Sequence, residues 1–201
     1  MKNQPQKIVL AEDLEEIGQG ESYPVPCGTI VSALARETAQ RKGIDLIEAP
    51  QGLIGLGADH GGFAMKEEVK AYLDKLGYAV HDFGVHDENP VDYPDVAHRV
   101  ARAVSQGICP MGILVDGAGI GSAMAANKVP GIRAALCYDE ATARNSREHN
   151  YANILTLGGR MQPLEAIQAI VRSWLETPYG PQRHRRRVDK ITQIEKRYSR
   201  S

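Results

Sequence analysis

The stretch Gly112-Ile113-Leu114-Val115-Asp116-Gly117-Ala118-Gly119-Ile120-Gly121-Ser122 predicts the type of fold. Residues 112–115 predict a buried strand, and a helical stretch follows at about 121–127. Glycines between a strand and a helix let backbone N–H groups approach an anion, helped by the positive end of the helix. The sequence therefore predicts a strand–loop–helix unit with a ligand at its loop.

The same alternation of strand and helix extends on both sides of this loop. Strands are expected at 53–58, 79–83, 112–115, 132–137 and 153–157, and helices at 63–76, 96–107, 121–127, 140–147 and 164–174. This order predicts an α/β fold with a five-stranded parallel sheet covered by helices on both faces. Ligands of such sheets bind at the carboxyl ends of the strands. The loops 59–62 and 116–122 and the turn after Leu157 are expected there.

Residues 1–51 have a different character and are predicted to form an extension to the domain at 52–201. Tyr23-Pro24-Val25-Pro26 predicts an extended spacer, Thr29–Lys42 a short helix, and Ala49-Pro50-Gln51-Gly52 a linker. We expect the extension to be too small for a core of its own, and to dock on the main domain or on a partner.

Composition excludes several classes of protein. The 201 residues are 42% hydrophobic and 24% charged, which is ordinary for a globular protein. No apolar run reaches the roughly 20 residues of a membrane span, and residues 1–8 lack the pattern of a secretory signal. Cys27, Cys109 and Cys137 are widely spaced, which indicates neither disulfides nor a zinc site. We expect a reducing, cytoplasmic location and no metal.

Charge is unevenly distributed although the net charge is only −1. The segment 183–201 carries eight Lys or Arg residues and two acids. Such a basic tail could bind nucleic acid, or it could supply cations to an anionic ligand. Tyr198 is its only aromatic residue and no nucleic-acid-binding module is evident, so we expect no nucleic-acid partner.

The glycine loop itself allows more than one interpretation. It could be a dinucleotide fingerprint, with Asp139 as the acid that binds the ribose. Its glycines are spaced G-x-G-x-G, however, and it does not lie in the first strand–helix unit, which argues against a nucleotide. It could also be a purely structural turn.

Several motifs in register resemble those of the type B ribose-5-phosphate isomerases, which share a fold with the galactose-6-phosphate isomerase subunits. These motifs are Ala58-Asp59-His60-Gly61-Gly62-Phe63, Asp92-Tyr93-Pro94-Asp95, Gly117–Lys128, Gly131-Ile132-Arg133-Ala134, Ser146-Arg147-Glu148-His149-Asn150 and Leu157-Gly158-Gly159-Arg160. The resemblance covers about 53–198. It implies a Rossmann-like three-layer fold, a homodimer or homotetramer with shared active sites, and interconversion of ribose 5-phosphate and ribulose 5-phosphate without a cofactor.

The resemblance also assigns roles to residues of this chain. It implies that His149 and His60 open the sugar ring, for which a histidine pKa near neutrality is suitable. Alternatively, each histidine is an ordinary polar side chain in a loop. Arg183 and Arg187 match the phosphate-binding arginines, and their i, i+4 spacing places them on one helical face. A solvated basic helix is the alternative for this pair. The other expected substrate-binding residues are Asp59, Tyr93, Gly117, Gly119, Gly121, Asn150 and Arg160.

The residue that moves the carbon-bound proton is where this chain departs from its relatives. One branch of the family has cysteine at position 116 and another has glutamate at position 122, whereas this chain has Asp116 and Ser122. A carboxylate in a dry site can act as this base, so Asp116 is the predicted one. Ser122 is expected to replace the hydroxyl that Ala118 lacks, with backbone N–H groups of Gly119 to Gly121 beside it. Alternatively, Asp116 only caps the helix.

Two alternatives concern the whole protein. An altered loop could suit a tetrose or hexose phosphate, or it could leave a sugar-phosphate-binding scaffold without activity. The extension carries Thr29-Ile30-Val31-Ser32-Ala33-Leu34-Ala35-Arg36-Glu37, which is similar to short segments on enzymes of bacterial microcompartments. It could target the enzyme to such a shell, or it could be an arm that stabilises the oligomer.

Overall fold

The computed structural model describes residues 8–14, 19–20, 22–26, 30–49, 52–87 and 89–199. They form two compact units, 1–53 and 54–201. Cys27, Thr29, Pro50 and Gln51, which carry several of the expectations above, lie outside the described residues. No described helix is long and apolar enough to cross a membrane.

The larger unit is a parallel five-stranded sheet with the strand order β6-β5-β7-β9-β8. Its strands are β5 (Ile54–Ala58), β6 (Val80–Asp82), β7 (Met111–Asp116), β8 (Ala134–Leu136) and β9 (Ile154–Gly158). Its helices are α2 (Phe63–Lys75), α3 (Tyr93–Ser105), α4 (Ile120–Ala126), α5 (Glu140–Asn150), α6 (Leu164–Glu176) and α7 (Gln182–Tyr198). The predicted α/β class and the five parallel strands are confirmed.

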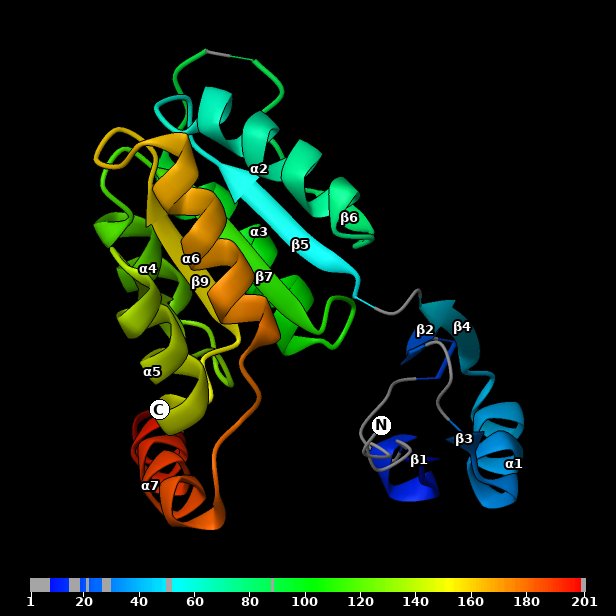
Figure 1. Ribbon diagram of the computed structural model, residues 1–201. Coiled ribbons are helices and arrows are strands. Elements are labelled where there is room, and N and C mark those ends of the chain that lie inside the picture. The colour runs from blue at the N-terminus through cyan, green and yellow to red at the C-terminus, as the bar shows by residue number, and fades with distance from the viewer. Residues whose placement is uncertain are drawn as a thin grey trace. The chain divides into compact units, whose positions relative to one another are not determined.

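Helices cover both faces of the sheet (Figure 1). Helices α2, α5 and α6 share a core with one face, in which Leu73, Leu155 and Trp174 are fully buried. Helix α3 approaches the other face so closely that a β-carbon on Gly57 would lie 2.7 Å from the Val96 side chain. Gly57 in β5 and Gly112 in β7 therefore set the depth at which α3 packs. Strands β5 and β9 are buried along their whole length.

The smaller unit contains β1 (Ile8–Val9), a 3-10 turn η1 (Ala11–Leu14), β2 (Ser22–Pro26), β3 (Ile30–Val31), α1 (Ala33–Lys42) and β4 (Asp45–Ala49). The expected spacer at 23–26 is a strand, paired in parallel with β4. The expected helix begins later than predicted, because Ser32 caps it by accepting a hydrogen bond from the Ala35 N–H. Contrary to our expectation, this unit buries a small core of its own, in which Leu14, Ala35 and Ala39 pack together.

Candidate functional site

The carboxylate of Asp116 is the centre of the loop that follows β7. Its Oδ1 accepts hydrogen bonds from the N–H groups of Ala118, at 2.8 Å, and of Gly119. Its Oδ2 accepts one from the N–H of Ser122, at 2.9 Å. Asp116 is 5% exposed and Ser122 only 3%. The carboxylate therefore holds the loop closed around itself, and the Ser122 side chain is buried rather than presented to a ligand.

The carbonyl groups of the same loop are also fixed. The Tyr138 hydroxyl donates to the Ala118 carbonyl at 2.7 Å, and the Thr156 hydroxyl donates to the Gly119 carbonyl at 2.8 Å. Gly119 has a φ of +78°, and a β-carbon there would lie 2.5 Å from Leu136. Because the Gly119 N–H already binds Asp116, it is not available to an oxyanion as predicted. Among the described residues, the N–H groups of Ile120 and Gly121 have no partner.

Other predicted site residues surround this loop at the carboxyl edge of the sheet. A β-carbon on Gly61 would lie 3.4 Å from both the Asp59 carboxylate and the Arg160 guanidinium. One on Gly121 would lie 2.6 Å from the Tyr93 ring, and one on Gly117 would lie 3.9 Å from Arg160. The His60 ring accepts a hydrogen bond from the Val91 N–H at 3.4 Å. The fold therefore gathers Asp59, His60, Tyr93 and Arg160 around the Asp116 loop.

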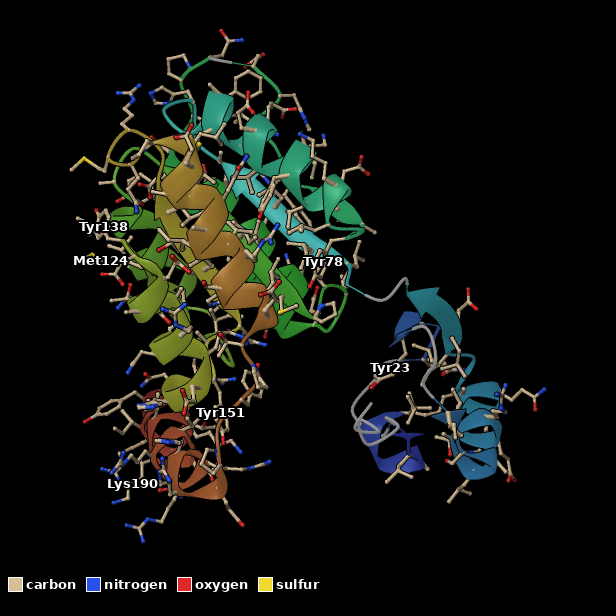
Figure 2. The ribbon with its side chains drawn as sticks, viewed as in Figure 1. Tyr23, Tyr78, Met124, Tyr138, Tyr151 and Lys190 are labelled. Atoms are coloured by element: carbon tan, nitrogen blue, oxygen red, sulfur yellow. The ribbon has the colours of Figure 1, made fainter. Side chains whose placement is uncertain are left out.

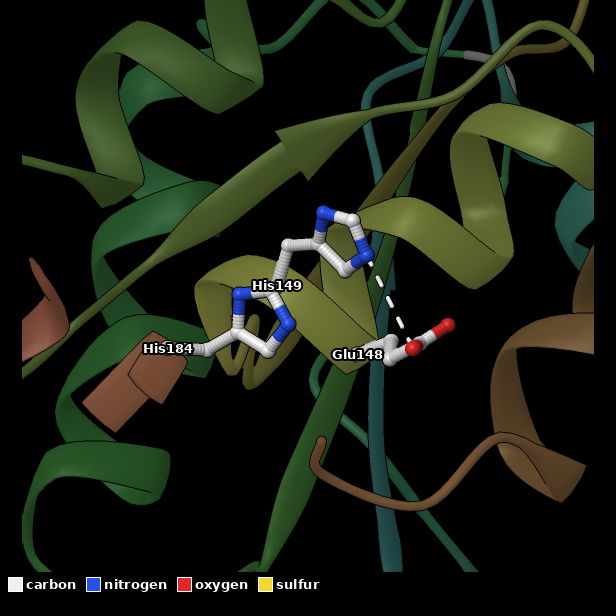
Figure 3. Close-up of side chains that lie close together, drawn as sticks. All are labelled: Glu148, His149 and His184. Atoms are coloured by element: carbon white, nitrogen blue, oxygen red, sulfur yellow. Dashed lines mark ion pairs between the residues drawn. The ribbon is translucent and has the colours of Figure 1, made fainter. Parts of the chain in front are cut away.

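The remaining predicted residues form a second group on α5 and α7. His149 and Asn150 end α5, and Arg183 and Arg187 lie in the first turns of α7, where they line an open hollow of about 600 Å³. The His149 ring stacks on that of His184 with centroids 4.2 Å apart (Figure 3). The His149 Nε2 lies 3.7 Å from the Glu148 carboxylate. The imidazoles of this group can transfer protons, and its guanidinium groups can bind an anion.

These two groups lie at opposite ends of the sheet. Helix α5 starts after β8, at the carboxyl edge, and runs back so that Asn150 shortly precedes the first residue of β9. Helix α7 packs on α5 beyond that end, far from the carboxyl ends of the strands (Figure 1). A single chain therefore does not bring Asp116 together with His149 and the arginines of α7.

A buried arginine attaches the segment that leads to α7. Arg147 lies between the rings of Trp174 and Tyr179, with its guanidinium carbon 4.9 Å and 4.4 Å from their centroids. It donates to the carbonyls of Ala152, at 2.7 Å, and Thr177, at 3.3 Å. The Tyr151 ring stacks on Tyr179, and its hydroxyl donates to the Gly180 carbonyl; Figure 2 labels Tyr151 next to α7. These contacts fix where α7 begins.

Two residues at this end were missed by the sequence analysis. His184 is 3% exposed, and burial, followed by the positive charges of His149, Arg183 and Arg187, lowers its pKa. Its position between the two predicted phosphate arginines was the available signal. Glu148 directly precedes His149, but its position alone does not indicate a function. The sequence spacing indicated no metal ligands, yet the fold places Glu148, His149 and His184 close together, because α6 returns the chain to α5 before α7 begins.

Asp139 and the cysteines have structural positions. The Asp139 carboxylate caps α5 by accepting a hydrogen bond from the Thr142 N–H at 2.7 Å, so it is already engaged and does not support the dinucleotide interpretation. Cys109 and Cys137 are free and buried. Burial raises the pKa of the Cys109 thiol to about 11, which disfavours a reactive thiolate.

Known proteins with similar sequences indicate the family of this chain. Residues 54–191 match the family described as Ribose/Galactose Isomerase. The chain belongs to this family. Ribose-5-phosphate isomerase B of Escherichia coli is 44% identical over 144 residues, which are 72% of this chain and 97% of that protein. D-erythrulose-4-phosphate isomerase of Pectobacterium atrosepticum is 38% identical, over 69% of this chain and 91% of that protein.

Solved structures support the same assignment. The structure of Clostridium thermocellum ribose-5-phosphate isomerase B is 51% identical, has a TM-score of 0.72, and aligns over 73% of this chain and 99% of its own. The predicted family and isomerase class are confirmed, and this member of the family is a sugar-phosphate isomerase. The family match covers residues 54–191, so it does not include the smaller unit.

Proposed function

We propose that this chain interconverts ribose 5-phosphate and ribulose 5-phosphate through ring opening and an enediolate. The observation that carries the proposal is the closed Asp116 loop, with Asp59, His60, Tyr93 and Arg160 around it at the carboxyl edge of the sheet. Relatives named for this reaction align over nearly their whole length. The erythrulose-phosphate relative makes a tetrose phosphate the main competing substrate.

Asp116 is the proposed base that takes the proton from C2 and returns it to C1. Its Oδ1 accepts two hydrogen bonds from described residues, whereas Oδ2 accepts one. A carboxylate oxygen can accept two, so Oδ2 keeps a lone pair for the proton. The N–H groups of Ile120 and Gly121 would stabilise the enediolate oxygen. Ser122 contributes through its N–H, which holds Asp116 in place.

A homo-oligomer is the proposed state of the enzyme, since the two groups of site residues lie at opposite ends of one chain. A second copy would supply His149 for ring opening, Asn150 for substrate binding, and Arg183 and Arg187 for the phosphate. Arg160 and His60 of the first copy would complete the site. Each guanidinium group can donate two parallel hydrogen bonds to phosphate oxygens. The i, i+4 spacing of Arg183 and Arg187 on α7 lets both arginines reach the same phosphate.

Substrate and base are tested together by an isomerisation assay in D2O with pentose, tetrose and hexose phosphates. We expect deuterium incorporation fastest with ribose 5-phosphate, and a decrease of about 10²–10⁴ in kcat for Asp116→Asn. Asp116→Cys, the matched control, restores a proton acceptor and should retain turnover. Exchange that is fastest with a tetrose phosphate would reassign the substrate. Turnover unchanged in Asp116→Asn would leave Asp116 as a cap only.

The extension is proposed to direct this cytoplasmic enzyme to a microcompartment shell or to a neighbouring subunit. Leu34 at the start of α1 is 62% exposed and Ile30 is 46% exposed, which leaves apolar side chains for a partner. Fusing residues 1–51 to a fluorescent protein in shell-forming cells tests the first role. We expect punctate fluorescence that Leu34→Asp disperses; diffuse fluorescence with both fusions would favour the oligomer arm.

A further inference from the structure

The end of the isomerase unit that carries α7 holds three side chains of the kinds that bind metal ions. Glu148, His149 and His184 each offer one ligand atom, and these atoms all lie within 4.8 Å of one another. The three side chains meet where α5 ends against α7 (Figure 3). Two imidazoles and a carboxylate are a frequent protein ligand set for zinc.

His184 provides an independent reason to expect a ligand there. It is 3% exposed, and neither of its ring nitrogens has a hydrogen-bond partner among the described residues. A buried polar atom without a partner costs free energy, so native proteins usually satisfy it. Its neighbour in the stack, His149, is partly open to solvent. An ion that enters from the solvent side of His149 would therefore reach an imidazole that needs a partner.

The arrangement requires a modest closure before it can bind an ion. Zinc binds histidine nitrogen at about 2.0–2.1 Å, which places tetrahedral ligand atoms about 3.3 Å apart. The side chains of His149 and Glu148 are 41% and 46% exposed and can turn, while buried His184 stays in place. The two rings are stacked at 14°, so His149 would leave the stack to share an ion with His184.

We propose that Glu148, His149 and His184 form a Zn²⁺ site, and that zinc inhibits the isomerase when it is bound there. Three protein ligands leave the fourth position of the ion for water. The inhibition rests on the proposed role of His149 in ring opening, since a metal-bound imidazole nitrogen cannot carry a proton; binding itself does not. Arg183 and Arg187 lie on the same helix turns and oppose a cation, so binding is weak and reversible.

Equilibrium dialysis of the full chain against ZnCl2, without substrate, tests the site. We expect one Zn²⁺ per chain, and at least about tenfold weaker binding in His184→Gln and in Glu148→Gln. His98→Gln is the matched control, because His98 is an exposed histidine on α3, and it should bind like the wild type. Equal binding in the wild type and in His184→Gln would overturn the proposal.

Co²⁺ substitution keeps the test valid if His184→Gln fails to fold. The wild-type chain should then show the visible absorption of four- or five-coordinate Co²⁺, and absence of these bands at saturating Co²⁺ would overturn the proposal. Activity is measured separately: zinc should slow turnover, and a chelator should restore it. A chain that binds zinc but isomerises no sugar phosphate would refute the proposed function while retaining the site.

Discussion

At the carboxyl end of the sheet the candidate site is made largely of main chain, whereas at the opposite end it is made of side chains on two helices. The Asp116 loop is held by three backbone N–H groups and two anchored carbonyls. The other end depends on His149, His184 and the arginines of α7. The contacts of the Asp116 loop fix its shape. At the other end the exposed side chains, such as His149 and Glu148, can rearrange, while His184 is buried.

This difference explains how each end can change in evolution. Position 119 accepts only glycine, because φ is positive and Leu136 fills the place of a β-carbon. The chemistry at the loop can therefore change only through the few side chains that it carries, such as Asp116. At the α7 end, exposed residues can be exchanged without altering the backbone. We expect specificity to vary more readily there.

Mixing two inactive variants is the strongest test of the separation between the ends. We call the carboxyl end of the sheet, with Asp116, the loop end, and the opposite end, with His149 on α5 and the arginines of α7, the helix end. Asp116→Asn disables the loop end and His149→Asn disables the helix end, and each should lower kcat by about a hundredfold or more. In a heterodimer of the two, one shared site contains neither substitution. Random mixing should restore about a quarter of wild-type activity. A mixture that stays as inactive as its components would show that sites are not shared.

The sequence predicted the loop end better than the helix end, for physical reasons. Strand periodicity and glycine spacing are local signals, so β5, β7 and the loop of Asp116 lie where they were expected. The alternative role of Asp116 as a helix cap agrees with the hydrogen bond that it accepts from the Ser122 N–H. The stacking of His149 on His184 depends on how α6 and Arg147 place α7, which no local pattern encodes. The core of the smaller unit was missed because its strands pair non-locally.

Gly62→Ala tests how closely the start of α2 packs against the backbone of β7 at the loop end. A β-carbon at Gly62 would lie 2.2 Å from the Val115 carbonyl oxygen, which belongs to the backbone of β7 and cannot move alone. We expect a loss of about 2–3 kcal/mol in the free energy of unfolding, measured with urea. Gly61→Ala is the matched control, since its nearest contacts are at 3.4 Å, and it should lose far less. Equal losses would mean that crowding is not the cause.

Arg147→Met tests the attachment of α7 at the helix end. The change keeps the bulk of the side chain, but it leaves the carbonyls of Ala152 and Thr177 without their donor and removes the cation–π interactions with both rings. We expect about 1–3 kcal/mol lower stability and a higher KM for the sugar phosphate, with a smaller change in kcat. Arg172→Met, on exposed surface of α6, is the control. An unchanged KM would mean that the position of α7 set by Arg147 does not affect substrate binding.

Lys70→Gln tests how much the ion pair between Lys70 and Asp82 stabilises the loop end, and its expected effect is the smallest. Although burial raises the pKa of Asp82, hydrogen bonds from Lys66 and Lys70 lower it to about 2, below its ordinary 3.8. Asp82 accepts a hydrogen bond from the Gly84 N–H, and the Gly84 carbonyl accepts one from the N–H of Ala58, the residue before Asp59. This lowered pKa contributes stability that is present above pH 3.8 and is lost as the pH falls toward 2.

Removing the Lys70 donor should raise the pKa of Asp82 toward its ordinary value. Acid unfolding, followed by circular dichroism, should then begin at a slightly higher pH, with less than about 1 kcal/mol lost at neutral pH because Lys70 is partly exposed. Lys75→Gln, at the end of the same helix, is the control and should leave the acid transition in place. An acid transition that moves equally in both variants would indicate general charge repulsion, whereas a shift confined to Lys70→Gln would place the electrostatic support at Asp82.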